Sequence, residues 1–134
     1  MDGQCQCGTI KFRTPVPEPL QVYICHCTQC RHQSSSAFGV SAIFPAFEIK
    51  PPHPDAIRIF SRPTASGRQL DCLFCSKCGS RLVHKCKGRA TFSVKGGCLD
   101  GLSLTGAIHI WCKEAVVHIP TGSQAFDEEP PESR

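Results

Sequence analysis

The chain has 134 residues, of which 40% are hydrophobic and 19% charged, a size and composition that fit one domain and exclude global disorder. Its formal net charge is +4, but the basic residues are dispersed and only one Trp and one Tyr are available to stack on bases, so we expect no nucleic-acid partner. No apolar stretch approaches the roughly 18 residues of a membrane span and no signal-like segment opens the chain, so we expect a cytoplasmic protein without membrane contact.

Short stretches with apolar residues at every second position recur along the chain and predict β-strands. The first two are "TIKFR" (9–13) and "LQVYI" (20–24). Similar strands are expected at 38–44, 56–60, 68–74, 81–85, 90–94, 107–111 and 115–119. Turn signals rich in Pro and Gly separate them, and no segment has a convincing period of 3.6 residues. We therefore predict a mainly β single domain at 1–126, followed by an acidic flexible tail at 127–134.

Eleven cysteines are the most informative feature of the sequence. Their number is odd and no export signal precedes them, so a disulfide framework is disfavoured. Seven fall into three spaced motifs, C-x-C, C-x-C-x-x-C and C-x-x-C, which are typical of metal ligands. These motifs contribute Cys5 and Cys7, then Cys25, Cys27 and Cys30, then Cys75 and Cys78.

The two paired motifs together offer four sulfurs, the closed tetrahedral set of a structural zinc site. We predict that Cys5, Cys7, Cys75 and Cys78 bind one zinc ion, which would tie the amino terminus to a distant strand. Metal affinity then contributes directly to folding free energy. The alternative is that one of the pairs only packs as buried cysteine.

Cys25, Cys27 and Cys30 are one sulfur short of a closed site. Three protein ligands and one free position are the pattern of catalytic zinc, and an all-thiolate set favours a soft fourth ligand such as a thiol. The alternative is a second structural site whose fourth ligand comes from elsewhere in the chain: His26, His32, His84, Cys72, Cys86, Cys98 or Cys112. For Cys72 the strand alternation favours a buried core cysteine.

The motifs "CQCGTIKF", "CHCTQCR" and "FCSKCGSRL", in this order, resemble the glutathione-dependent formaldehyde-activating enzyme family, which includes centromere protein V-like proteins. The resemblance implies a small zinc-stabilised β-tent of the Mss-four-like type, with two zinc ions, one structural and one catalytic, on the cysteine sets given above. It also implies carbon–sulfur lyase activity on glutathione or similar thiol adducts, such as S-hydroxymethylglutathione. One departure is Ser35, which stands where the family usually has a glycine, so that it either strains the loop or adds a hydroxyl to the pocket.

Three residues near the trio are candidate catalytic groups. His26, between two ligands, and His32, just after the third, are candidates for the base that moves a proton near neutral pH. Arg31 could donate hydrogen bonds to metal-bound sulfurs or bind a substrate carboxylate. The bland alternatives are a solvent-facing His26 and an Arg31 that binds loop carbonyls. The competing function is a non-enzymatic binding module of the centromere protein V type, although the basic extensions expected of one are absent.

Overall fold

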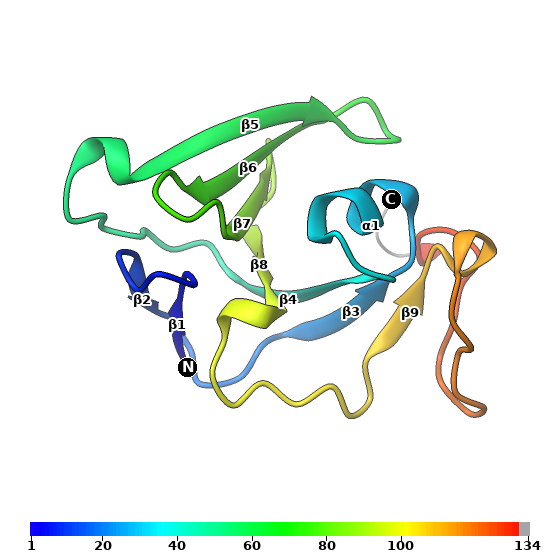
Figure 1. Cartoon of the computed structure of the whole chain (residues 1–134). Helices are drawn as coiled ribbons and strands as arrows, with labels where there is room; N and C mark the ends of the chain where they lie inside the picture. The colour runs from blue at the N-terminus through cyan, green and yellow to red at the C-terminus, as the bar shows by residue number, and fades with distance from the viewer. Residues whose placement is uncertain (132–134) are drawn as a thin grey trace.

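The computed structural model describes residues 1–131, and its regular secondary structure is mainly β-strand (Figure 1). Seven strands form one sheet in the order β5-β6-β7-β8-β4-β3-β9, in which only the β3–β9 pair is parallel, and a separate hairpin pairs β1 with β2. The strands are β1 (Asp2–Gln4), β2 (Lys11–Arg13), β3 (Gln21–Cys25), β4 (Gly39–Pro45), β5 (Ile57–Pro63), β6 (Gln69–Cys75), β7 (Arg81–Cys86), β8 (Thr91–Lys95) and β9 (Ile108–Ile110). The helices are α1 (Thr28–Ser34) and three single 3₁₀ turns, η1 (Pro54–Ala56), η2 (Gly96–Cys98) and η3 (Cys112–Glu114).

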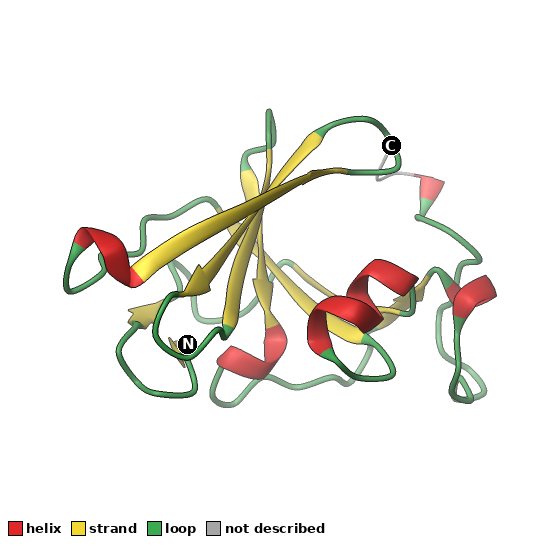
Figure 2. Ribbon diagram, turned by 45° about the horizontal axis from the view of Figure 1, so that its top comes forward, coloured by secondary structure: helices red, strands yellow, loops and turns green. Residues whose placement is uncertain are grey.

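The prediction of a mainly β, small single-domain fold is confirmed. The large sheet is strongly twisted and stays open (Figure 2). Eight of the nine predicted strands are present within a residue or three of their expected bounds. The strand predicted at 115–119 is wrong: Val116 is 60% exposed and Val117 is 40% exposed, so their apolar side chains contribute no face to the sheet.

The single α-helix was not predicted. Helix α1 has seven residues, none of which is buried, so it has no apolar stripe from which a helical period could be read. It begins where the sulfur of Cys27 accepts a hydrogen bond from the backbone N–H of Cys30. It ends at Ser35, whose φ of 52° lies in the left-handed region. The helix is therefore defined by its two ends and not by its faces.

The core lies on one face of the large sheet. Val22, Ala42, Val94 and Val83 are consecutive cross-strand partners from β3 to β7, and each is at most 8% exposed. Phe44, two residues along β4 from Ala42, is completely buried on the same face. Since side chains alternate along a strand, the intervening residues point to the opposite face, which carries the polar and sulfur-containing side chains described below.

After β9 the chain returns along the edge of the sheet. The backbone N–H of Phe126 donates to the carbonyl of His109 at 2.9 Å, and the indole N–H of Trp111 donates to the carboxylate of Glu129 at 3.1 Å. Residues 127–131 of the predicted tail are described and the remainder, 132–134, lies outside the described residues, so the domain boundary at 126 stays a prediction. Within residues 1–131, we find no helix with both the length and the apolar character of a membrane span.

Candidate metal centres

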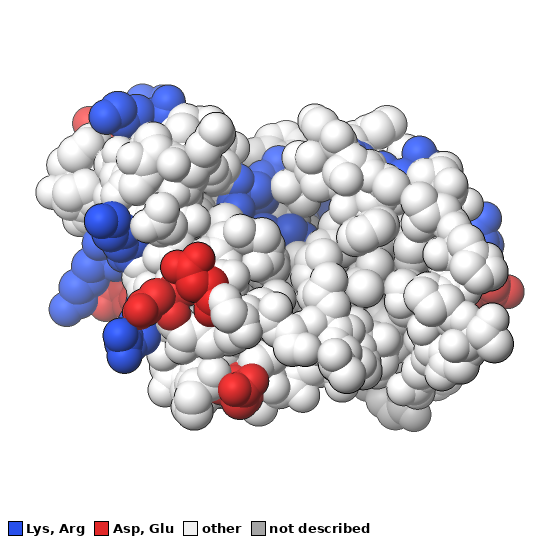
Figure 3. All heavy atoms as spheres, turned by 60° about the horizontal axis from the view of Figure 1, so that its bottom comes forward, with Lys and Arg blue, Asp and Glu red and all other residues white. Residues whose placement is uncertain are grey.

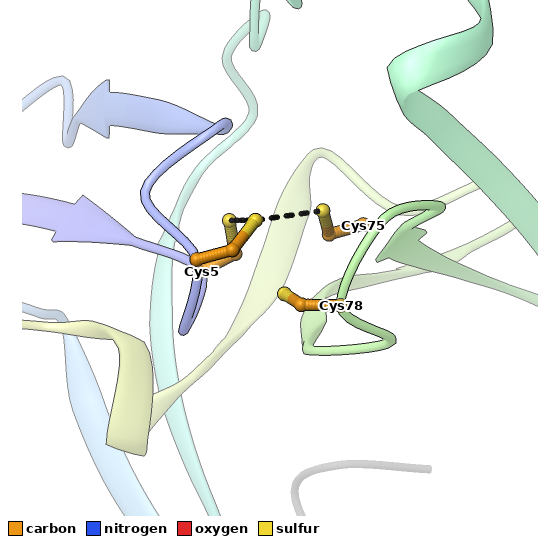
Figure 4. Close-up of side chains that lie close together, drawn as sticks. Cys5, Cys75 and Cys78 are labelled. Atoms are coloured by element: carbon orange, nitrogen blue, oxygen red, sulfur yellow. Dashed lines mark hydrogen bonds between the residues drawn. The ribbon is translucent and has the colours of Figure 1, made fainter.

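The first cluster joins the two paired cysteine motifs. The four sulfurs of Cys5, Cys7, Cys75 and Cys78 all lie within 4.8 Å of one another. The Sγ atom of Cys7 is 3.6 Å from that of Cys5 and 3.8 Å from that of Cys75. A tetrahedral zinc ion with Zn–S bonds of about 2.3 Å requires its sulfurs to be about 3.8 Å apart, so the cluster fits zinc. Figure 4 shows the sulfurs converging from the loop after β1 and from the turn between β6 and β7.

Each pair is held on a tight turn with a glycine immediately after its second cysteine. Gly8 has a φ of 77° and Gly79 a φ of 80°, a backbone conformation that glycine adopts without steric cost. The turn at Gly79 is closed by its N–H, which donates to the carbonyl of Cys75 at 2.8 Å. The motifs C-x-C-G and C-x-x-C-G therefore bring two sulfurs to the same side of each turn.

Hydrogen bonds at the rim of this cluster favour thiolates. The hydroxyl of Ser80 lies 3.2 Å from the sulfur of Cys78 and lowers the pKa of that thiol to about 5. The hydroxyl of Thr9 likewise lowers the pKa of Cys7. Burial instead raises the pKa of Cys75 to about 11. Cys75 consequently needs a bound cation to ionise, and metal binding should release protons.

The second cluster is the trio Cys25, Cys27 and Cys30, whose sulfurs also lie within 4.8 Å of one another. Cys25 is the last residue of β3, Cys27 caps the start of α1, and Cys30 lies in the first turn of that helix. Among residues 1–131, this cluster contains no fourth Cys, His, Asp or Glu ligand atom. The trio therefore fits a metal ion with one position left for another molecule, and the alternative of a fourth protein ligand finds no support.

The three thiols of the trio share hydrogen bonds and so ionise unequally. Hydrogen bonds with Cys25 and Cys30 lower the pKa of Cys27, whereas hydrogen bonds with Cys27 and Cys30 raise the pKa of Cys25. Three sulfurs this close cannot all carry negative charge without a neutralising cation. The chemistry of this donor set is thus that of a soft divalent metal site.

The three predicted catalytic residues lie in different surroundings. His26 is completely buried, and its Nε2 atom lies 2.9 Å from Nδ1 of His109. Arg31 donates to the hydroxyl of Thr28 at 3.3 Å. His32 is exposed and is the member of the three that lines a cavity next to Cys30. The structure therefore brings His32 to the accessible side of the trio and places His26 behind it.

Two hollows meet beside α1. The first has a volume of about 220 Å³ and is lined by Gln29, Cys30, His32, Gln33, Phe60, Arg62, Arg81 and His84. The second, of about 710 Å³, shares Gln33 and Arg81 with the first and extends past Lys95 toward Cys5 and Cys78. In Figure 3, Lys and Arg atoms lie inside a hollow near the middle of the face shown. The cavity beside the trio is therefore cationic.

The sequence analysis missed these cationic residues. Lys95 is only 6% exposed, and its ammonium group donates to the hydroxyl of Ser41 at 3.1 Å. A methyl group built on Gly39 would lie 3.7 Å from the Lys95 nitrogen and 3.5 Å from the sulfur of Cys30, so both atoms flank Gly39 on the same side. Burial lowers the pKa of Lys95, while the nearby Cys30 and Cys25 thiolates oppose that shift. The available signal was the alternation in "TFSVK", which puts Lys95 on the face opposite Val94.

Taken together, the open β-sheet and the two cysteine clusters define a small, mainly β, cysteine-rich protein whose clusters are suited to zinc. The glutathione-dependent formaldehyde-activating enzyme family model matches residues 1–114, so the chain belongs to that family, as its motifs indicated. A solved protein of Rhodobacter sphaeroides has the same fold, with a TM-score of 0.58 and 18% identity over 77% of this chain and 91% of that chain. A comparison with curated proteins found no match.

Proposed function

We propose that this protein is a zinc-dependent carbon–sulfur lyase that makes or breaks the bond between the sulfur of a glutathione-like thiol and a small carbon electrophile. Formation and cleavage of S-hydroxymethylglutathione is the reference reaction for the family. The observation that carries the proposal is the trio, in which three sulfurs converge beside a cavity without a fourth protein ligand in the described part of the chain. A reducing compartment such as the cytoplasm would suit it, since all eleven cysteines are free thiols.

Two zinc ions would serve different purposes. Cys5, Cys7, Cys75 and Cys78 would hold a structural ion, and Cys25, Cys27 and Cys30 a catalytic one. Zinc bound to the trio would supply a Lewis acid that stabilises negative charge on the substrate sulfur as the carbon–sulfur bond breaks. The chain itself must then position the rest of the substrate and move a proton.

Residues around the trio suit these tasks. His32, in the cavity wall, would exchange the proton of the adduct hydroxyl, since an imidazole ring can both accept and donate a proton. His26 would act indirectly: its backbone N–H donates to the carbonyl of Ile110 at 3.0 Å, which fixes the loop between Cys25 and Cys27. Arg31 would hold the helix start through Thr28, whose hydroxyl also donates to Glu114 at 2.8 Å.

The test is a titration of the cobalt-substituted protein with glutathione. A thiolate entering the free position of the trio should change the sulfur-to-cobalt charge-transfer and d–d absorption at millimolar thiol. S-Methylglutathione, which cannot supply a thiolate, is the control ligand, and Cys27→Ser is the control protein. If glutathione leaves the wild-type spectrum unchanged, the lyase proposal fails and the alternative of a non-enzymatic binding module is favoured.

A further inference from the structure

The polar face of the sheet collects cations next to the trio. Arg62 and Phe60 are two residues apart on β5 and therefore point to the same face. Phe60 is the cross-strand partner of Cys72, which in turn pairs with His84. His84 pairs with Ser93 on β8, two residues before Lys95. Paired residues share a face, so Arg62, His84 and Lys95 point to one side of the sheet. Cys25 is on that side as well. It pairs with Gly39, and Gly39 is two residues from Ser41, which pairs with Lys95.

Arg81 is the cation that lines both hollows, and its side chain is held in place by two neighbours. Its Nη1 atom lies 3.1 Å from Nε2 of His84, and its guanidinium lies 5.8 Å from the centre of the Phe60 ring. Burial keeps His84 neutral by lowering its pKa to about 2, so its Nε2 atom can accept a hydrogen bond from Arg81. The guanidinium is thereby oriented before any ligand arrives.

In the part of the chain that the structure describes, none of these cations forms an ion pair with an Asp or Glu carboxylate. Within residues 1–131, the two ion pairs found are Arg13 with Asp2 and Lys113 with Glu128, and neither is in the cavity. Arg62 donates to a backbone carbonyl, that of Pro63, at 3.1 Å. Asp100 lines the larger hollow, but no Asp or Glu is among the residues that line the smaller one with Arg62 and Arg81. A partly desolvated pair of arginines of this kind is stabilised by an anionic ligand.

A second unsatisfied group lies between the two hollows. The Oε1 atom of Gln33 is buried and has no hydrogen-bond partner in the described part of the chain, although Gln33 lines both hollows. A buried acceptor of this kind is costly unless a ligand or water donates to it. The Gln33 oxygen complements the arginines, because it would accept a hydrogen bond from an N–H group of a ligand whose carboxylate the arginines bind.

We propose that Arg81, assisted by Arg62, binds a carboxylate of the substrate, and that Gln33 accepts an N–H from the same molecule. This inference rests on the proposed function and specifies which residues of the chain would recognise the peptide part of the substrate while its sulfur is at the trio. Arginine suits this role because its planar guanidinium can donate two parallel hydrogen bonds to one carboxylate. Neutral thiols of similar size would lack this anchor and bind more weakly.

Calorimetric titration of the zinc-loaded protein tests the carboxylate anchor separately from catalysis. The ligands are glutathione, S-methylglutathione and glutathione diethyl ester, which lacks both free carboxylates. We expect the wild-type protein to bind glutathione at least about tenfold more tightly than its diethyl ester, which keeps the thiol, as expected for loss of one charge-assisted pair. Arg81→Gln should remove most of that preference, and Arg62→Gln part of it. Arg58→Gln, on the same strand but outside both hollows, should leave it unchanged.

The two proposals fail in different ways. Equal affinity of the wild-type protein for the acid and the ester, or no binding of either, would overturn the carboxylate anchor whatever the cobalt spectrum shows. An unchanged cobalt spectrum together with Arg81-dependent binding of S-methylglutathione would overturn the lyase proposal and retain the anchor. If Arg81→Gln does not fold, Arg81→Lys is the second variant, because it keeps the charge but loses the planar fork. It should show a reduced preference for the acid over the ester. An unreduced preference in both Arg81→Lys and Arg62→Gln would also overturn the anchor.

Discussion

The sulfur of Cys7 lies 3.8 Å from that of Cys75, although the two residues are 68 positions apart in the chain. Strands β2 to β6 lie between them, so a metal ion bound to both would close a loop that contains about half of the protein. A cross-link of this kind stabilises the fold mainly by restricting the unfolded chain, and more strongly for a longer loop. The trio, in contrast, spans only six positions and closes almost no loop.

This contrast predicts different outcomes for two equivalent substitutions. Cys75→Ser should abolish or strongly weaken folding, by several kcal/mol, because it would take a fully buried sulfur away from the long-range cluster proposed to bind the structural ion. Cys27→Ser should change the free energy of unfolding by less than about 1.5 kcal/mol, because the serine hydroxyl can still accept the hydrogen bond from the Cys30 N–H that caps α1. Thermal unfolding followed by circular dichroism and zinc content per chain are the measurements. Equal destabilisation by the two substitutions, or zinc content near one ion per wild-type chain, would contradict the separation into structural and catalytic ions.

The sequence predicted the sulfur clusters better than their surroundings. Spacing within a motif is local, and a C-x-x-C-G turn aims its sulfurs whatever the rest of the chain does. The pairing of Cys5 and Cys7 with Cys75 and Cys78 is long-range, but counting ligands to four was sufficient to propose it. The strands at 20–24 and 38–44 were likewise predictable, because each buries alternate side chains on one core face.

The cationic cavity depends on information that alternation alone does not contain. Which face of β5 joins which face of β8 is decided by strand order and register, including the irregularity between Leu73 and Phe74 where β6 meets β7. Arg62, Arg81 and Lys95 therefore looked like dispersed surface charges. The burial of His26 depends on similar long-range information: its place between two predicted ligands suggested access to the site, whereas the parallel strand β9 covers it with His109. Its catalytic role stays a prediction.

Ser35 offers a direct test of backbone strain next to the trio. Its φ of 52° and ψ of 38° place a serine in the left-handed conformation that ends α1, and its side chain lines neither hollow. Of the two expectations for this departure from the family pattern, the geometry supports strain in the loop. Ser35→Gly should raise the free energy of unfolding by about 1 kcal/mol, because glycine tolerates this conformation. Ser36→Gly, next to it but without a positive φ, should not raise it; equal effects in urea unfolding would remove the argument.

Gly39 is predicted to set the space available to Cys30. A methyl group at Gly39 would lie 3.1 Å from Cβ of Cys30, tighter than ordinary contact, so Gly39→Ala should displace the helix start. We expect zinc to be held at the trio roughly tenfold more weakly, as for other changes that support metal ligands indirectly. Competition with a chromophoric chelator measures this directly. Gly97→Ala is the control, because a methyl group there meets nothing within 4 Å, and it should bind zinc as the wild type does. If Gly39→Ala also binds zinc with wild-type affinity, the prediction is refuted.

Buried His84 predicts a specific pH dependence of stability. Burial, together with the charges of Lys95 and Arg81, lowers its pKa in the folded protein to about 2, whereas its pKa in the unfolded chain is about 6.5. Below pH 6.5 the unfolded chain therefore binds a proton that the folded protein excludes, and stability falls by up to about 1.4 kcal/mol per pH unit. This contribution is fully present above pH 6.5 and is lost on acidification.

The variant His84→Gln separates this effect from protonation of the two cysteine clusters, which both proteins share. Glutamine is uncharged at all these pH values, and its carbonyl oxygen can still accept a hydrogen bond from Arg81. Between pH 7 and pH 5.5 the wild-type protein should lose about 1 kcal/mol more unfolding free energy than His84→Gln, measured in urea with saturating zinc. The difference arises because the variant has no imidazole to protonate at this position. Parallel pH profiles for the two proteins would mean that His84 becomes protonated in the folded state, and the neutral hydrogen-bond acceptor that orients Arg81 would then be lost.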